Sequence, residues 1–188
     1  MKITETRLPG VLMIEPKVFG DARGFFLETF AVKRYEEAGI RGPFVQDNMS
    51  KSAKGIVRGL HLQSPAAQGK LVWVVAGAVL DVAVDVRVGS PTFGAHVAIE
   101  LSEDDKRQLW IPPGFAHGFC VTSESAIFAY KCTEYYAPEN EVGVAWNDPD
   151  LGIEWPVLEP VISGKDRAHP RLKDVDPAKL PRYEETGA

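Results

Sequence analysis

The decapeptide V-L-D-V-A-V-D-V-R-V, residues 79–88, is the clearest indication of fold in this chain. Hydrophobic residues at positions 80, 82, 84, 86 and 88 alternate with Asp81, Ala83, Asp85 and Arg87. Side chains of a β-strand point alternately to opposite faces, so this pattern is typical of a strand with one apolar and one polar face. We therefore predict a strand over residues 79–88 with one face in the core and the other in water.

Shorter runs on either side of this strand are also extended in character. Residues 97–101 alternate in the same way, and we expect further extended segments at 11–15, 25–30, 45–50, 109–111, 119–121 and 126–133. The sequence predicts one helix, at about residues 31–38 and ended by Gly39, and a turn-rich loop at 19–24. Many short strands separated by 17 glycines and 14 prolines predict an all-β sandwich or barrel.

The composition suits one globular domain. The chain has 188 residues, of which 45% are hydrophobic, and a formal net charge of −5. We predict a single domain over residues 1–188, with a barrel core at about 25–160 and a tail at about 161–188 that wraps the surface. The negative charge argues against binding to nucleic acid, although a local basic pocket for a small phosphorylated ligand remains compatible with it.

The chain also lacks the sequence features of a secreted or membrane protein. The N-terminal residues contain no apolar signal segment, and the longest apolar run, residues 71–80, is about half the length of a membrane span. Cys120 and Cys132 are too few for a disulfide framework. These observations favour a cytoplasmic protein that does not enter a membrane.

The segment G-I-V-R-G-L-H-L-Q, residues 55–63, places an arginine and a histidine inside an apolar, extended run. In a regular strand Arg58 and His61 face opposite sides, so both reach one pocket only if the strand is distorted. Gly59 lies between them and is a natural position for a β-bulge. Of the two side chains, only the imidazole exchanges protons near neutral pH. The alternative is a core histidine satisfied by a backbone carbonyl beside a surface arginine.

Several classes of chemistry have no support in the sequence. His61, His96, His117 and His169 are scattered and show no metal-ligand spacing. Glycine-rich phosphate loops of the GxxxxGK[ST] or GxGxxG type and the GxSxG motif of serine hydrolases are absent from the sequence. We therefore predict a protein that works without a metal or another cofactor.

Acid–base groups remain, and each has a structural alternative. Lys70 enters an apolar strand. Its ammonium group stabilises an enolate oxygen, or its side chain simply reaches the edge of the sheet. Tyr130 is a proton donor or a packed ring with one hydrogen bond. His117 is a core residue or a donor to an anion, and Asp166 is a loop charge or the partner that makes His61 a better base.

The order and spacing of these residues closely resemble the dTDP-4-dehydrorhamnose 3,5-epimerase family. In addition, Pro112, Gly114 and His117 are similar to the second conserved motif of the wider cupin superfamily, whereas its metal-binding first motif is absent. The loop at residues 62–67 is about one residue shorter than is usual in the family. The matching stretches are residues 15–26, 45–48, 57–61, 68–72, 90–94, 107–112, 114–119, 130–131, 135–138, 146–148 and 152–156.

The resemblance implies a double-stranded β-helix, that is, a cupin or jelly-roll barrel with a few short helices. It also implies a homodimer that inverts carbons 3 and 5 of dTDP-4-dehydro-6-deoxy-D-glucose in dTDP-L-rhamnose biosynthesis. Carried over by position, His61 is the base, Asp166 orients it, Lys70 supports the enolate oxygen and Tyr130 returns a proton from the opposite face. Tyr136 matches the platform that stacks on thymine. The expected substrate-binding residues are Arg23, Glu28, Gln46, Asp47, Asn48, Arg58, Lys70, His117, Tyr136, Glu141 and Lys165.

Three other functions fit the same sequence. The first is a related epimerase that inverts only carbon 3 or only carbon 5, and the second is a cupin ketoisomerase acting on a similar dTDP-sugar. The third is a cupin that binds a sugar nucleotide without catalysis. The set of His61, Lys70, Tyr130 and Asp166 argues against the third, because binding alone requires neither an acid nor a base.

Overall fold

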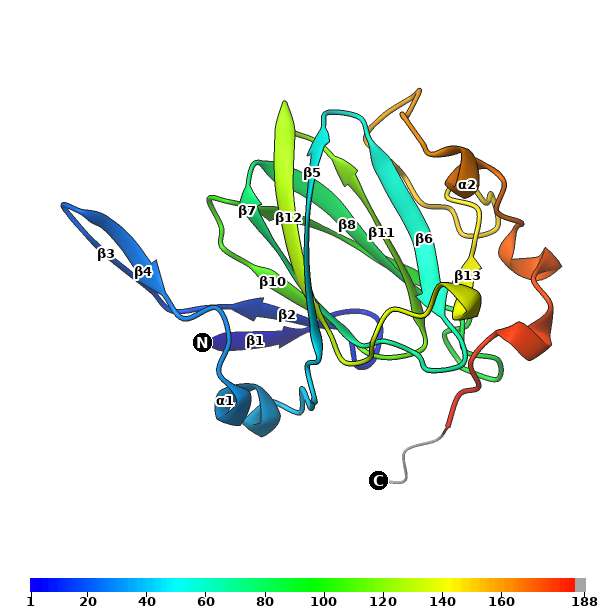
Figure 1. Ribbon diagram of the computed structural model, residues 1–188, viewed down its shortest axis with the longest axis horizontal. Helices are drawn as coiled ribbons and strands as arrows, with labels where there is room; N and C mark the ends of the chain where they lie inside the picture. Colours follow the sequence, from blue (N-terminus) through cyan, green and yellow to red (C-terminus); the bar gives the residue numbers. More distant parts are fainter. Residues whose placement is uncertain (185–188) are drawn as a thin grey trace.

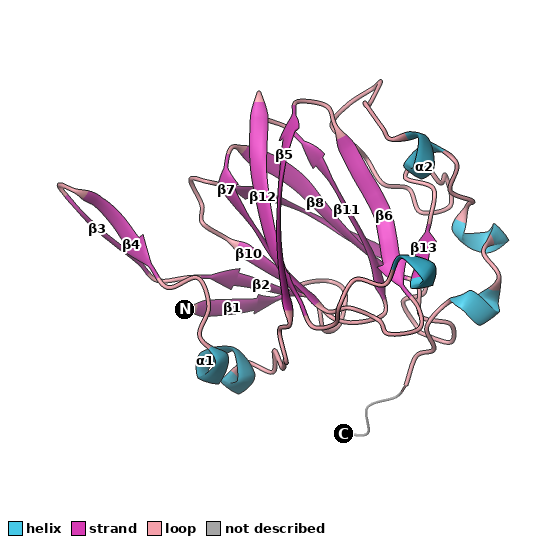
Figure 2. Cartoon of the chain, viewed as in Figure 1, coloured by secondary structure: helices cyan, strands magenta, loops and turns pink. Residues whose placement is uncertain are grey.

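Two antiparallel sheets pack against each other in the computed structural model, which describes residues 1–184 (Figure 1). Strands dominate the molecule and helices are short (Figure 2), which confirms the predicted all-β, cupin-like fold. The first sheet has the order β1 (Lys2–Glu5), β2 (Leu12–Glu15), β10 (Gln108–Ile111), β7 (Lys70–Ala76), β12 (Ser125–Cys132) and β5 (Gln46–Ala53). The second has the order β13 (Glu141–Gly143), β6 (Val57–Gln63), β11 (Phe115–Val121), β8 (Ala78–Asp85) and β9 (His96–Ser102).

Strand β8 confirms the predicted strand as far as Asp85, three residues short of the expected end at Val88, but not its polar outer face. The face that carries Asp81 and Ala83 points into the core between the two sheets, and Asp81 is fully buried. The opposite face, with Val82 and Val84, is also buried, against Leu172 and its neighbours in the C-terminal segment. The prediction of a wet face was wrong because chain segments far away in sequence cover both sides of this strand.

The second carboxylate of this strand is buried but fully partnered. Asp85 accepts hydrogen bonds from Arg87 at 2.7 Å, from Ser90 at 2.5 Å and from Thr92 at 2.6 Å. Burial disfavours the charged form, but these donors outweigh it and lower the pKa of Asp85. The polar residues that alternate in β8 therefore form buried ion pairs and hydrogen bonds and do not face solvent.

The C-terminal segment lies along the outer face of the second sheet and includes α2 (Gly164–Arg167), η2 (Leu172–Asp174) and η3 (Pro177–Lys179) (Figure 1). Leu172, Val175 and Leu180 anchor it in the same apolar cluster as Val82. Ser163 caps α2 by accepting a hydrogen bond from the backbone N–H of Asp166 at 3.0 Å. The segment thereby brings Asp166 against β6.

A hairpin of β3 (Val18–Asp21) and β4 (Gly24–Leu27) projects away from the two sheets (Figure 1). The predicted loop at 19–24 was therefore wrong, and the extended run that begins at Phe25 ends at Leu27. The ring residues Phe19, Phe25 and Phe26 are 52%, 60% and 69% exposed. Such a set of exposed aromatic side chains is typical of a surface that a partner covers.

The remaining local predictions concern one helix, the cysteines and membrane spans. Helix α1 (Val32–Glu37) lies within the predicted range, and Gly39 follows it with a φ of 81°, as expected of a C-terminal glycine. Cys120 and Cys132 are both buried and free. Within residues 1–184, no helix has the length and apolar character required to cross a membrane.

Candidate active site

The sequence-predicted catalytic residues line two cavities of about 570 and 390 Å³ between the sheets. His61 on β6 belongs to one sheet, and Lys70 on β7 and Tyr130 on β12 belong to the other. Asp166 on α2 lines both cavities as well. The cavities share these four residues and Tyr136, so they form two parts of one site.

A distortion at Gly59 lets β6 present two side chains to this site. His61 pairs with His117 of β11 and Arg58 pairs with Phe119, so β6 contains one more residue than its partner between these pairs. Gly59 has a φ of 124°, and a Cβ atom there would lie 2.6 Å from the Cα of Gly118. Arg58 and His61 both line the larger cavity, which confirms the predicted bulge.

His61 and Asp166, separated by 105 residues in sequence, form a close pair. The His61 Nε2 and Asp166 Oδ1 atoms are 2.7 Å apart, and the backbone N–H of Gly59 donates to Asp166 Oδ2 at 3.2 Å. Burial raises the pKa of Asp166, but the hydrogen bond to His61 and the other contacts prevail and lower it below its usual value. An ionised Asp166 holds the proton on Nε2, which leaves Nδ1 of a neutral His61 as the basic nitrogen.

Lys70 and Tyr130 face His61 from the opposite sheet. Burial lowers the pKa of Lys70, while the nearby Cys132 and Asp81 act in the other direction. Burial also raises the pKa of Tyr130, so its phenol stays protonated at neutral pH. The site thus contains an imidazole, a buried amine and a protonated phenol around one cavity.

Polar residues of the smaller cavity are linked by hydrogen bonds. The Gln46 amide donates to Asn48 Oδ1 at 3.0 Å and accepts from the backbone N–H of Tyr136 at 2.9 Å. Glu141 accepts from the Tyr136 hydroxyl at 2.8 Å and forms an ion pair with Lys165 at 2.7 Å. Burial raises the pKa of Glu141, but Lys165 and Tyr136 outweigh this and lower it.

Three predicted substrate-binding residues do not line either cavity. Asp47 lies on β5 between Gln46 and Asn48, so its side chain points to the opposite face of the strand from theirs. There it forms an ion pair with Lys131 at 2.9 Å. Arg23 lies at the tip of the β3–β4 hairpin beside Asp21, and Glu28, which follows this hairpin, pairs with Arg34 at 3.3 Å.

A second histidine–carboxylate pair lies beside the larger cavity, which His117 lines and buried Asp81 does not. The His117 Nε2 and Asp81 Oδ2 atoms are 2.9 Å apart, and Asp81 Oδ1 has no hydrogen-bond partner. Sequence reasoning included His117 but missed Asp81, because its alternating strand indicated a solvent-facing carboxylate. The two residues meet because β8 pairs with β11, and no pattern in the sequence predicted that pairing.

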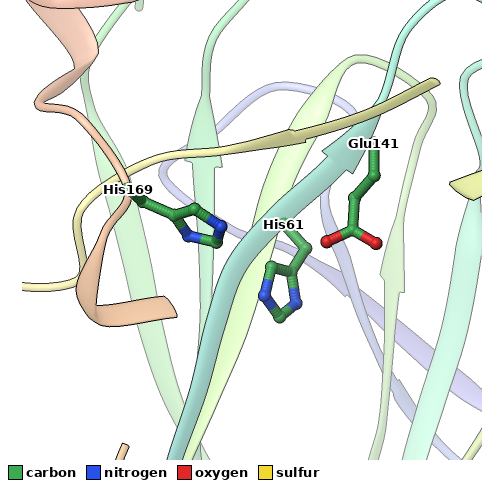
Figure 3. Close-up of side chains that lie close together, drawn as sticks. All are labelled: His61, Glu141 and His169. Atoms are coloured by element: carbon green, nitrogen blue, oxygen red, sulfur yellow. The ribbon is translucent and has the colours of Figure 1, made fainter. Parts of the chain in front are cut away.

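His169 is a further residue that sequence reasoning did not connect with the site. Its ring packs edge-on against His61, with the ring centroids 5.5 Å apart (Figure 3). Burial, followed by the charge of His61, lowers the pKa of His169. Within the described part of the chain, His61, Glu141 and His169 are the only group of three histidine, cysteine or carboxylate side chains arranged closely enough to hold a metal ion.

Comparison with known proteins identifies the family. A model of the dTDP-4-dehydrorhamnose 3,5-epimerase family matches residues 5–174. The enzyme of that name from Shigella flexneri is 55% identical over 94% of this chain and 98% of its own. A crystal structure of dTDP-6-deoxy-D-glucose-3,5-epimerase from Legionella pneumophila in complex with dTDP-4-keto-L-rhamnose has a TM-score of 0.95 and 56% identity, covering 97% of this chain and 98% of that one. ChmJ, a 3'-monoepimerase from Streptomyces bikiniensis in complex with dTDP-quinovose, has a TM-score of 0.89 and 35% identity, covering 95% and 92%.

A cupin-like β-sandwich that encloses a histidine, a lysine and a tyrosine, together with these similarities, defines the class of protein as a sugar-nucleotide epimerase. More narrowly, the chain belongs to the dTDP-4-dehydrorhamnose 3,5-epimerase family.

Proposed function

We propose that this chain inverts carbons 3 and 5 of dTDP-4-dehydro-6-deoxy-D-glucose and forms dTDP-4-dehydro-L-rhamnose. The observation that carries this proposal is the position of the His61–Asp166 pair across one cavity from Lys70 and Tyr130. Family membership supports the same reaction. Both carbons are adjacent to the 4-keto group, so loss of either proton gives an enolate whose charge is spread onto the carbonyl oxygen.

In the proposed mechanism, Nδ1 of His61 removes the proton from the carbon. Asp166 holds the ring in the required tautomer and stabilises the imidazolium that forms, because its carboxylate is ionised and close to Nε2. The Lys70 ammonium acts on the enolate oxygen, where a fixed charge in a dry cavity strongly stabilises developing negative charge.

Inversion requires a second group on the other side of the sugar ring, and we assign that role to Tyr130. Its strand belongs to the sheet opposite His61, and its phenol remains protonated because burial raises its pKa. A proton removed by His61 on one face is then replaced by Tyr130 on the other. Before the second carbon reacts, His61 releases its proton to solvent and Tyr130 regains one from solvent. Repetition of both transfers at that carbon then completes the double epimerisation.

The rest of the site is suited to the nucleotide. Arg58 and Lys165 supply positive charge for the diphosphate, and Gln46 and Asn48 supply neutral hydrogen-bonding groups. Tyr136 is 53% exposed at the edge of both cavities, which suits a ring that stacks on thymine.

We also propose that the chain acts as a homodimer in which the β3–β4 hairpin of one copy completes the site of the other. The support is the projecting hairpin with its exposed phenylalanines, and the distance of Arg23 and Glu28 from the cavities of their own chain. Mixing inactive Arg23→Ala and His61→Ala variants is expected to restore activity, because one site of a mixed dimer then contains neither change. A mixture of His61→Ala and Asp166→Asn is the control and should remain inactive. Equal inactivity of both mixtures would oppose the shared site.

The reaction is tested by incubating the purified protein with dTDP-4-dehydro-6-deoxyglucose in deuterated water and following carbons 3 and 5 by NMR. Deuterium at both carbons, with the L-sugar trapped by a reductase, is the expected result. Exchange at one carbon alone would establish a single-site epimerase, the activity that the name of the similar protein ChmJ describes. A migrated keto group would indicate a ketoisomerase, and no exchange would leave a binding protein and remove His61 as the base.

A further inference from the structure

Three side chains from separate parts of the chain converge at one side of the candidate active site (Figure 3). His61 lies on β6, Glu141 begins the neighbouring strand β13, and His169 follows α2. One ligand atom from each residue lies within 4.8 Å of the others. Two imidazoles and a carboxylate in such an arrangement are the donor set of many protein sites for divalent transition metals.

Local packing places His169 at this position. Strand β13 pairs with β6 so that Gly143 lies opposite His61. The His169 ring occupies the space beside Gly143, and a Cβ atom at position 143 would overlap that ring. Glycine at 143 therefore permits His169 to approach His61, and the contact follows from the backbone arrangement, not from a flexible surface side chain.

Neighbouring groups hold two of the three side chains in orientation. Asp166 contacts Nε2 of His61 at 2.7 Å, and the Tyr136 hydroxyl donates to Glu141 at 2.8 Å. Carboxylates and hydroxyls in these positions orient the ligands of metal sites and raise their affinity. The Nδ1 atom of His169 is buried and has no hydrogen-bond partner, so contacts within the fold do not satisfy this polar atom.

We propose that His61, Glu141 and His169 bind a divalent transition metal ion, with Zn²⁺ as the best match, and that this ion inhibits the enzyme. Zn²⁺ lies about 2.0–2.2 Å from nitrogen and oxygen ligands, so the three atoms must move to about 3.4 Å from one another. This closer approach requires Glu141 to release Lys165, whose side chain is already 58% exposed to solvent. Nitrogen donors disfavour Mg²⁺ and Ca²⁺ at this site.

The inhibitory part of this inference rests on the proposed role of His61. A metal ion on His61 consumes its lone pair or locks the ring away from the substrate, so proton removal stops. Binding of the ion itself is independent of that role. The two parts can therefore be measured separately.

The binding arm compares wild-type protein with His169→Gln and with the matched control His96→Gln, which changes a histidine that lines a different cavity. Zn²⁺ affinity is measured by competition with a chromogenic chelator, and Co²⁺ is used as a spectroscopic probe. We expect one ion per chain in wild type and control. In His169→Gln we expect Zn²⁺ to bind at least about tenfold more weakly. Equal affinity in all three proteins, or no Zn²⁺ binding by wild type, would overturn the site.

The activity arm follows deuterium exchange into the substrate with increasing Zn²⁺. We expect inhibition that EDTA reverses and Mg²⁺ does not reproduce. Half inhibition of His169→Gln should require about tenfold more Zn²⁺, with each rate expressed relative to that of the same protein without metal. Zn²⁺ binding without inhibition would refute the inhibitory part alone. If the chain catalyses no exchange, the proposed function fails while the chelator measurement still decides whether the ion binds.

Discussion

The two histidine–carboxylate pairs of this molecule, His61–Asp166 and His117–Asp81, share their chemistry but not their surroundings. The two histidines occupy adjacent strands and lie directly opposite each other in the β6–β11 register. The side chain of His61 is 32% exposed and that of Asp166 6%, whereas the values for His117 and Asp81 are 8% and 0%. The imidazole of the first pair is the more accessible, and we call the two pairs the open and the closed pair.

Backbone regularity explains this difference. The β11–β8 register is continuous from Phe115 to Val121, so His117 and Asp81 lie on a regular strand pair. The β6 strand is interrupted at Gly59, and its distorted backbone turns an N–H toward Asp166. Asp166 thus has partners for both oxygens, while Asp81 Oδ1 has none. We therefore expect proton transfer at the open, fully partnered pair, and a contribution of the closed pair mainly to stability and to the shape of the cavity.

The largest expected effect is on catalysis at the open pair. Replacement His61→Ala is expected to lower turnover by about 10²- to 10⁴-fold, because general base catalysis contributes on that order. Steady-state rates with dTDP-4-dehydro-6-deoxyglucose measure this loss, and far-UV circular dichroism establishes that the variant is folded. Turnover within a few-fold of wild type would contradict the assignment of His61 as the base, since the base would then have to be His117 or another group.

Replacement of His117 in the closed pair is expected to lower the stability of the fold more than replacement of His61 does. Replacement His117→Ala leaves a fully buried carboxylate without its partner and should cost about 3 kcal/mol of unfolding free energy. His61→Ala should cost less, about 1.5 kcal/mol, because Asp166 keeps the hydrogen bond from the Gly59 N–H whereas Asp81 Oδ1 has no partner. Urea denaturation of both variants at one pH provides the measurement. Equal destabilisation would mean that burial does not separate the two pairs.

The sequence predicted the open pair better than the closed one, for physical reasons. Gly59 between Arg58 and His61 pointed to a bulge, because opposite parity and a shared pocket are incompatible in a regular strand. Asp81 was misplaced because alternation shows that a strand has two different faces but does not show which one is covered. That depends on the C-terminal segment around Leu172, which packs on β8 from far along the chain.

Long-range partners depended on resemblance to a family and not on local pattern. Asp166 lies 105 residues from His61, and no spacing rule connects them. The β3–β4 hairpin was missed because its turn residues resemble a loop and its strands pair only with each other. His169 gave no signal at all, since its contact with His61 arises only when the tail folds back onto β13.

A smaller effect is expected at Tyr130, and it separates the two halves of the reaction. If the open pair removes the proton, Tyr130→Phe should lower net inversion by about 10²-fold while exchange of the carbon-bound hydrogen with deuterated water is largely retained. NMR measures the exchange, and reductase-coupled trapping of the L-sugar measures the inversion. Equal loss of exchange and inversion would contradict the assignment of Tyr130 as the acid on the opposite face.

The smallest expected effect is the pH dependence of stability at Asp166. Its pKa lies below the ordinary value of 3.8, so the ionised carboxylate stabilises the fold above that pH, and this contribution is lost as the pH falls through the lowered pKa. Asp166→Asn should therefore be less stable than wild type by about 1.5 kcal/mol near neutral pH, with the difference shrinking toward about pH 3. Urea midpoints across this range test the prediction. A difference that grows with acidity would mean that Asp166 is held protonated, and the open pair would then lack the charge that keeps Nδ1 of His61 basic.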